Sequence, residues 1–136
     1  MKLHVFGEKD EMGAAAAART AELLNAAIAE RGEATLILAT GMSQFEMLSH
    51  LVKAVVDWSK VTVFHLDEYL GVPESHPASF RKYLKERFVQ QVSGLRVFHF
   101  VDGEAADAEA ECRRLGELIA ARPVDVACIG IGENGH

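Results

Sequence analysis

The sequence predicts an α/β fold, a Rossmann-like open parallel sheet with helices on both faces. Short apolar runs alternate along the 136 residues with longer stretches whose apolar residues recur at helical spacing, which is the pattern of successive β-α-β units. The short runs are apolar almost throughout, as expected of parallel strands that helices cover on both faces. No repeat, low-complexity linker or composition change divides the chain. We therefore expect a single α/β domain over residues 1–136, with the order β-α-β-α-β-α-β-α-β.

Each expected element follows from a local signal. Apolar runs predict strands at residues 3–6, 34–39, 61–66, 95–100 and 124–129. Apolar residues at helical spacing predict helices at residues 10–31, 43 to about 56, 77 to about 92, and 104–121. Gly32 stands where the first helix would end in the left-handed conformation, and Val55 completes the apolar face of the second. Pro77 suits the first turn of the third helix, where its missing N–H costs nothing, and Pro123 ends the fourth.

Composition and charge exclude several classes of function. The chain is 49% hydrophobic and 25% charged, as in an ordinary soluble globular protein. Its formal net charge of -6 argues against a nucleic-acid partner, and no apolar run approaches the roughly 20 residues of a membrane span. Cys112 and Cys128 lack the spacing of a metal site, and the N-terminus shows no signal-peptide pattern. A reducing cytoplasm is the expected location, and any phosphate site must be built locally.

The first of three informative loops follows the second predicted strand and reads Thr40-Gly41-Met42-Ser43-Gln44. A glycine turn that leads into a helix presents unpaired N–H groups and the positive end of the helix dipole, which suit a phosphate. The hydroxyls of Thr40 and Ser43 add donors. The alternative is that Gly41 only relieves a tight turn and Ser43 caps the helix.

The second loop carries adjacent acids, Asp67 and Glu68, directly after an apolar strand. Such acids are unusual there because each must be solvated or paired. A carboxylate at this end of a parallel strand can act as a general base. The alternative is a loop acid that caps a nearby helix. A metal-binding pair is a minor option because no third ligand is visible.

The third loop, residues 130–136, is rich in glycine and ends in His136. Gly130, Gly132 and Gly135 match G-x-G-x-x-G, but a dinucleotide fingerprint opens a helix early in a β-α-β unit and has an acid about 20 residues later. Histidine, with an ordinary pKa of about 6.5, suits proton transfer at neutral pH, although a lone histidine is more often structural. No strand follows to pair with the last one. We therefore expect the domain to continue beyond residue 136, or a bare strand to support a homo-oligomer.

Together, the loops resemble the glucosamine-6-phosphate deaminase/isomerase family, which shares a superfamily with 6-phosphogluconolactonase. The resemblance spans nearly the whole chain. It rests on Thr40-Gly41-x-Ser43, Phe64-His65-Leu66-Asp67-Glu68-Tyr69, His76-Pro77-x-Ser79 and Gly130-Ile131-Gly132-Glu133-Asn134-Gly135-His136. The lactonase branch resembles the last motif equally well but usually lacks the Asp-Glu-Tyr form, which favours the deaminase side.

The resemblance implies a reaction without a cofactor on a small sugar phosphate. It implies that His136 opens the pyranose ring, that Asn134 orients its imidazole, and that Asp67 moves a proton from C2 to C1 of the open sugar. Glucosamine 6-phosphate would thereby become a fructose imine, which water converts to fructose 6-phosphate and ammonia. The residues expected to bind the substrate and its phosphate are Thr40, Gly41, Met42, Ser43 and Glu68.

The sequence departs from the family pattern in ways that affect these expectations. Asn134 stands where the family often has Asp, so any tuning of His136 is weaker. Met42 and Gln44 replace a smaller residue and a proline of the phosphate loop, which bears on substrate size. A family glutamate a few residues beyond the histidine, and basic phosphate ligands further on, are absent from these 136 residues. We therefore expect little or no activity from residues 1–136 alone.

Three other interpretations remain open from the sequence. A 6-phosphogluconolactonase-type hydrolase would use His136 to activate water and would not need the Asp67 carboxylate. A non-catalytic sugar-phosphate sensor would bind without turnover, although no DNA-binding helix-turn-helix is visible. The third is a structural fragment with no function of its own.

Overall fold

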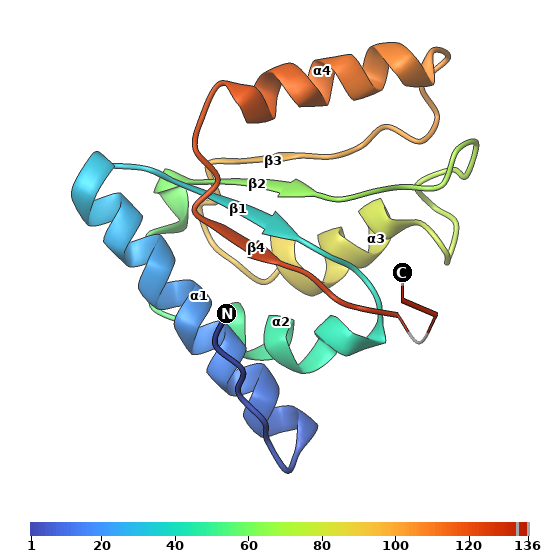
Figure 1. Cartoon of the computed structure of the whole chain (residues 1–136). Helices are drawn as coiled ribbons and strands as arrows, with labels where there is room; N and C mark the ends of the chain where they lie inside the picture. The colour runs from blue at the N-terminus through green and yellow to red at the C-terminus, as the bar shows by residue number, and fades with distance from the viewer. Residues whose placement is uncertain (133, 136) are drawn as a thin grey trace.

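The computed structural model describes residues 1–132, 134 and 135, and it confirms the α/β class. Its parallel strands form one sheet in the order β3-β2-β1-β4 (Figure 1). The strands are β1 (Ala34–Leu38), β2 (Val61–His65), β3 (Val97–His99) and β4 (Val126–Cys128). The helices are α1 (Lys9–Arg31), α2 (Phe45–Leu51), α3 (Phe80–Leu84) and α4 (Ala108–Ala120). Short turns precede α2 (η1, Met42–Gln44) and β2 (η2, Trp58–Lys60), and a π-helical turn (η3, Lys85–Val89) continues α3.

One face of the sheet forms the main core with α1, α2 and α3. Because side chains alternate between faces along a strand, β1 and β2 each send every second residue into this core. The fully buried members include Leu24, Leu36, Leu38, Leu48, Leu51, Val61, Val63, Leu84 and Phe88. Each such side chain contributes about 1.5–3 kcal/mol of burial free energy. This core fixes the strand ends that carry the three loops.

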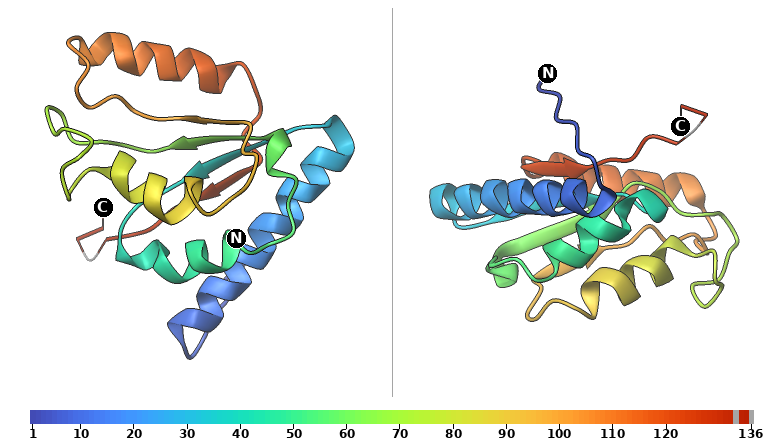
Figure 2. Two further views of the ribbon diagram at one scale, coloured as in Figure 1. Left: turned by 180° about the vertical axis from the view of Figure 1, so that it is seen from behind. Right: turned by 90° about the horizontal axis from the view of Figure 1, so that it is seen from below.

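The helix α4 lies beside β3, apart from the other three helices (Figures 1 and 2). Arg122, just after α4, donates from Nη1 to Oγ1 of Thr62 at 2.9 Å. The Thr62 side chain lies on the face opposite to Val61 and Val63. Helices therefore lie on both faces of the sheet, as the sequence predicts.

Helix α1 crosses α2 closely at Gly13. A Cβ atom at this position would lie 2.5 Å from Cβ of Glu46 and 2.8 Å from the backbone N of Met47. Only glycine leaves room for this approach. The crossing places α2, and hence the loop before it, against the rest of the core.

The predicted first strand is wrong. Residues 1–6 form no strand, and Leu3 and Val5 are 80% and 85% exposed. Figure 2 shows this segment running away from the sheet. A short apolar run becomes a strand only when a neighbour completes its hydrogen bonds, and no strand in the described part of the chain does so here. The final strand, by contrast, does have a partner, because β4 pairs with β1 from Leu36↔Val126 to Leu38↔Cys128.

Helix boundaries also differ from the predictions. The helix α2 ends at Leu51, where the backbone tightens into short turns, and Val55 is 91% exposed rather than on the apolar face. The helix α3 begins at Phe80 instead of 77, because Ser79 Oγ accepts from the Lys82 N–H and acts as the N-cap. Similarly, α4 begins at Ala108, with the Asp107 side chain as its cap. In the described part of the chain no helix is long and apolar enough to cross a membrane.

Candidate active site

A cleft of about 960 Å³ lies at the carboxyl ends of the strands and brings together the three loops singled out in the sequence. Such an edge is where open α/β sheets bind ligands. Of the predicted site residues, Thr40, Gly41, Met42, Ser43 and Asp67 line it. The remaining lining residues are Ala39, Leu66, Tyr69, Phe80, Ile129, Gly130, Ile131 and Gly132. His136 lies outside the described residues, so its predicted place in the site stays a prediction.

The first loop, for which the sequence predicts a phosphate site, turns sharply at Gly41. Gly41 has φ 102°, a left-handed conformation that favours glycine. The N-cap position of α2 is Gln44, not Ser43, and Ser43 lies within the η1 turn. The alternative that Ser43 caps the helix is therefore wrong. Its exposed Oγ accepts only a 3.2 Å hydrogen bond from Nε2 of Gln44 among the described residues, and it keeps a proton to donate to a ligand.

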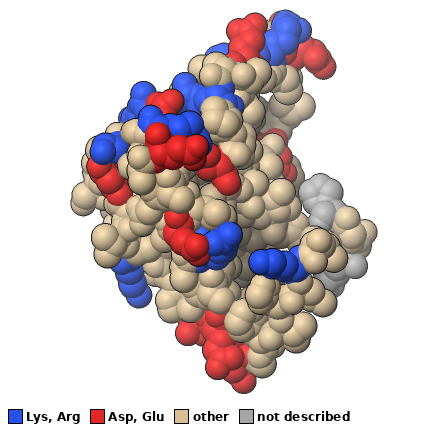
Figure 3. Space-filling model, turned by 60° about the vertical axis from the view of Figure 1, so that its left-hand side comes forward, with Lys and Arg blue, Asp and Glu red and all other residues tan. Residues whose placement is uncertain are grey.

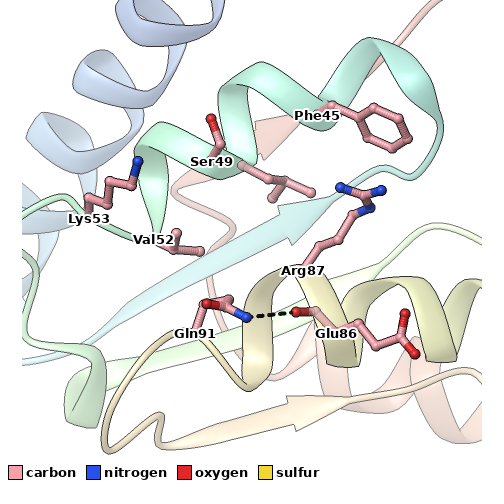
Figure 4. Close-up of a pocket in the computed structure, with 8 residues that line it drawn as sticks. Phe45, Ser49, Val52, Lys53, Glu86, Arg87 and Gln91 are labelled. Carbon is pink, nitrogen blue, oxygen red and sulfur yellow. Dashed lines mark hydrogen bonds between the residues drawn. The ribbon is translucent and has the colours of Figure 1, made fainter.

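Side chains from α2, α3 and η3 support this loop. The Tyr83 hydroxyl donates to the backbone oxygen of Gly41 at 2.9 Å. Burial raises the pKa of Tyr83 to about 12, so the donor proton is present throughout the physiological range. The Tyr83 ring stacks on Phe45 at 5.9 Å between centroids, and the Arg87 guanidinium lies 3.8 Å from the Phe45 centroid. Figure 4 shows Arg87 reaching from η3 toward Phe45 across a second cavity of about 280 Å³.

Gly130, in the third loop, packs directly against the first. A Cβ atom there would lie 2.9 Å from Ser43 Oγ and 3.1 Å from Nε2 of Gln44. A close approach of two loops accounts for this glycine without a dinucleotide. Asn134 is exposed. The N–H of its neighbour Gly135 donates to the Gly132 oxygen at 2.9 Å. Asn134 is not among the lining residues of the cleft, so its predicted orienting role stays a prediction.

The adjacent acids Asp67 and Glu68 have different environments. Asp67 is exposed, lines the cleft, and its side chain makes no hydrogen bond or ion pair with the described residues. The Glu68 side chain has 0% exposure. Its carboxylate accepts hydrogen bonds at 2.9–3.2 Å from Ser79 Oγ, from the N–H groups of Tyr69, Phe80 and Arg81, and from Arg81 Nε.

Glu68 therefore binds groups of the protein itself. Burial alone would raise the pKa of Glu68, but the N–H groups of Arg81, Phe80 and Tyr69 and the Ser79 hydroxyl lower it to about 2. The alternative of an acid that caps a helix thus applies to Glu68, at the start of α3. Since no part of its side chain is accessible, we revise its expected role from substrate contact to capping.

His65 is the last residue of β2, and its sequence context alone predicts no role for it. Its ring is buried, and Nε2 accepts from the Val101 N–H at 2.8 Å while Nδ1 has no partner among the described residues. Burial lowers the pKa of His65 to about 4, against the opposing effect of the Glu68 charge. The imidazole is therefore neutral at physiological pH and connects the ends of β2 and β3.

Two aromatic residues of the cleft were also missed from the sequence. The rings of Tyr69 and Phe80 lie 5.0 Å apart and both line the cleft. The Asp-Glu-Tyr motif was the available signal for Tyr69. For Phe80, which follows the capping Ser79, no such signal existed.

Figure 3 shows acidic and basic side chains interspersed on one face of the molecule. Among the described residues, no group of three or more His, Cys, Asp and Glu side chains is arranged to hold a metal ion. No Lys or Arg is among the described residues that line the cleft, so a phosphate there would have to be bound by backbone N–H groups and hydroxyls, as the sequence predicts for the first loop.

Comparison with known proteins gives consistent results. The family model for glucosamine-6-phosphate isomerases and 6-phosphogluconolactonases matches residues 7–136. A glucosamine-6-phosphate deaminase of Lactobacillus delbrueckii subsp. bulgaricus is 36% identical over the whole chain, which covers 56% of that protein. One from Listeria monocytogenes is 41% identical over 102 residues, which are 75% of this chain and 43% of that protein.

Solved structures show the same fold. A monomeric glucosamine-6-phosphate deaminase superposes with a TM-score of 0.88 at 30% identity, over 100% of this chain and 57% of its own. A 6-phosphogluconolactonase from Shewanella baltica superposes with a TM-score of 0.85 at 27% identity, over 96% of this chain and 57% of its own. The chain thus spans about half the length of the relatives it matches.

Proposed function

The chain belongs to the family of glucosamine-6-phosphate isomerases and 6-phosphogluconolactonases, and on that premise we propose that it forms part of a glucosamine-6-phosphate deaminase. The protein would convert glucosamine 6-phosphate to fructose 6-phosphate and ammonia. The observation that carries this proposal is the exposed Asp67 carboxylate, which lines the same cleft as the loop at Gly41 and Ser43. A carboxylate beside a bound sugar phosphate is what proton transfer between adjacent carbons requires.

The substrate would be held by its phosphate. The Thr40–Gly41–Met42–Ser43 loop supplies backbone N–H groups and two hydroxyls, and the hydrogen bond from Tyr83 to Gly41 keeps the loop in place. Met42, with 80% exposure at the cleft, gives this end of the site an apolar wall. Binding the distant phosphate fixes the reacting carbons relative to Asp67, which lowers the entropic part of the barrier.

Asp67 would act on the open-chain aldose as base and then as acid. It takes the proton from C2, and the electron pair of that bond forms a C1=C2 double bond while the C1 oxygen, losing its double bond to C1, takes a proton from solvent water. Asp67 then returns its proton to C1, which gives the fructose imine. Water adds to C2 of the imine, and ammonia leaves as the ketone forms. A single carboxylate can serve both positions because C1 and C2 are adjacent.

Ring opening would precede these steps. His136 would take the proton of the anomeric hydroxyl and give one to the ring oxygen, with Asn134 orienting its imidazole. Histidine suits this exchange because it both accepts and donates protons near neutral pH. We further expect a cytoplasmic enzyme that can self-associate.

The second candidate is lactone hydrolysis, which the likeness to the Shewanella baltica 6-phosphogluconolactonase favours. The two functions make different use of Asp67. Full-length gene product, wild type and Asp67→Asn, should be assayed for ammonia release from glucosamine 6-phosphate and for hydrolysis of 6-phosphogluconolactone. We expect ammonia release that Asp67→Asn abolishes. Lactone hydrolysis that survives Asp67→Asn, without ammonia release, would replace the proposal with the lactonase.

A further inference from the structure

The segment that carries Asp67, residues 66–72, is held by a buried arginine from α3. We call this segment the Asp67 turn. The Arg81 side chain is only 8% exposed. Within the turn, Nε of Arg81 contacts Oε2 of Glu68 at 3.2 Å, and Nη2 donates to the Val72 oxygen at 3.0 Å. One guanidinium thus contacts both halves of the turn, which the planar fork of arginine allows.

The same guanidinium ties the turn to the loop between β3 and α4. Nη1 of Arg81 contacts Oδ1 of Asp102 at 3.2 Å, and Nη2 contacts Oε2 of Glu104 at 3.0 Å. Asp102 is itself held in place, since its N–H donates to Oε1 of Glu111 at 2.8 Å. The turn is therefore connected through Arg81 to the first turn of α4.

Backbone contacts also join the Asp67 turn to the β3–α4 loop. The Gly71 N–H donates to the Gly103 oxygen at 2.7 Å. A Cβ atom on Gly103 would lie 2.4 Å from the backbone oxygen of Tyr69 and 2.9 Å from Cγ of Glu68. The β3–α4 loop therefore presses on the Asp67 turn without room for a methyl group.

The Asp67 side chain contributes nothing to this arrangement. It makes no hydrogen bond or ion pair with the described residues, so the position of its carboxylate follows from the backbone of the turn. That backbone is set by contacts of Glu68, Tyr69, Gly71 and Val72 with groups outside the turn.

We propose that Arg81 is a positioning residue for Asp67: by holding Glu68 and Val72 against the β3–α4 loop, it keeps the Asp67 carboxylate within reach of the substrate carbons. The inference rests on the proposed function for its chemical part. Glu68, the acid adjacent to the proposed base, and Arg81 together hold Asp67 in the position that proton transfer requires. A displacement of about 1 Å can cost on the order of 100-fold in rate, so small changes in the turn become measurable.

The test compares Arg81→Lys with wild type in the full-length protein. Lysine keeps the charge that Glu68 needs but cannot reach Glu68, Val72 and the acids of the β3–α4 loop together. Gly103→Ala displaces the same turn without changing any charge and serves as the second variant. The matched control is Asp125→Asn, because Asp125 pairs with Arg31 and accepts from the Thr35 N–H at the amino end of β1, away from the cleft.

Two readouts separate positioning from general stability. The first is steady-state turnover of glucosamine 6-phosphate carrying hydrogen or deuterium at C2. For Arg81→Lys and Gly103→Ala we expect kcat to fall about 10- to 100-fold, KM to stay within about twofold, and the isotope effect on kcat to rise, because proton removal becomes slower. A smaller folded fraction lowers the apparent kcat but leaves the isotope effect unchanged, as we expect of Asp125→Asn.

The second readout is amide hydrogen exchange, which needs no turnover. We expect faster exchange of residues 66–72 in both variants and unchanged exchange in the loop at Gly41. Unchanged exchange in the Asp67 turn, or faster exchange with an unchanged isotope effect and kcat, would overturn the positioning role. If wild-type protein released no ammonia, the proposed function would fail, and the exchange data alone would decide whether Arg81 holds the turn.

Discussion

Replacing His65 by Gln should make the stability of the protein much less sensitive to mild acid. In the folded state burial lowers the pKa of His65 from 6.5 to about 4. The unfolded chain therefore takes up a proton on His65 at a higher pH than the folded protein does. Its linked contribution to stability is complete above about pH 6.5, declines as the pH falls to about 4, and then levels off.

The size of this effect follows from the shift. One pKa unit corresponds to about 1.4 kcal/mol, so lowering the pKa from 6.5 to about 4 amounts to about 3 kcal/mol, most of it lost by pH 4.5. Total stabilities of domains are about 5–15 kcal/mol. The loss is therefore a large fraction of what holds the protein folded.

Urea unfolding at pH 7.5, 6.5, 5.5 and 4.5 measures this directly in wild type and His65→Gln. The glutamine amide oxygen can still accept from the Val101 N–H, which His65 Nε2 accepts at 2.8 Å, but the amide does not titrate. We expect the free energy of unfolding of wild type to fall by about 2–3 kcal/mol more than that of the variant between pH 7.5 and pH 4.5. Equal losses in the two proteins would refute the assignment of His65 as a buried neutral histidine.

Four further substitutions test the packing of the helices and of the first loop. Gly13→Ala should lower the free energy of unfolding by about 1–3 kcal/mol through overpacking, because its Cβ would lie 2.5 Å from Cβ of Glu46. The control Gly116→Ala in α4, with nothing within 4 Å of its Cβ, should instead raise it by up to about 1 kcal/mol. If urea unfolding showed both variants changing the free energy of unfolding in the same direction, the close crossing of α1 and α2 would be contradicted. Gly130→Ala should weaken binding of glucosamine 6-phosphate several-fold by displacing Ser43 Oγ, with little change in melting temperature; calorimetric titration giving the wild-type Kd would disprove the contact. Tyr83→Phe keeps the stack on Phe45 but removes the hydroxyl that donates to Gly41, so we expect the Kd to rise by roughly a factor of 5, about 1 kcal/mol, and an unchanged Kd would show that the loop needs no such support.

Much of the fold was predictable because its signals are local. The apolar runs of β1 and β2 and the glycine that ends α1 are visible in the sequence, and the structure places them as predicted. Gly32 has φ 81° and its N–H donates to the Ile28 oxygen, as expected of a helix C-cap. The run at residues 3–6 carries the same local signal, yet it forms no strand, since pairing depends on what lies beside it.

The site was predictable as a set of loops but not in its division of roles. Asp67 and Glu68 are adjacent and chemically alike. Which of the two caps a helix is decided only by the position of α3, which begins more than ten residues after Glu68. The role of His65 likewise depends on the N–H of Val101, 36 residues away. Such roles arise from tertiary contacts, which a reading of local motifs cannot supply.

Asp67 is proposed to move a proton between C2 and C1 of the sugar. The most direct test converts glucosamine 6-phosphate in D₂O with full-length protein and measures deuterium at C1 of the fructose 6-phosphate formed. We expect deuterium at C1, since a carboxyl proton can exchange with solvent between its two transfers, and we expect Asp67→Asn to form neither this product nor ammonia while still binding the sugar phosphate. Product formation at the wild-type rate by Asp67→Asn would contradict the account.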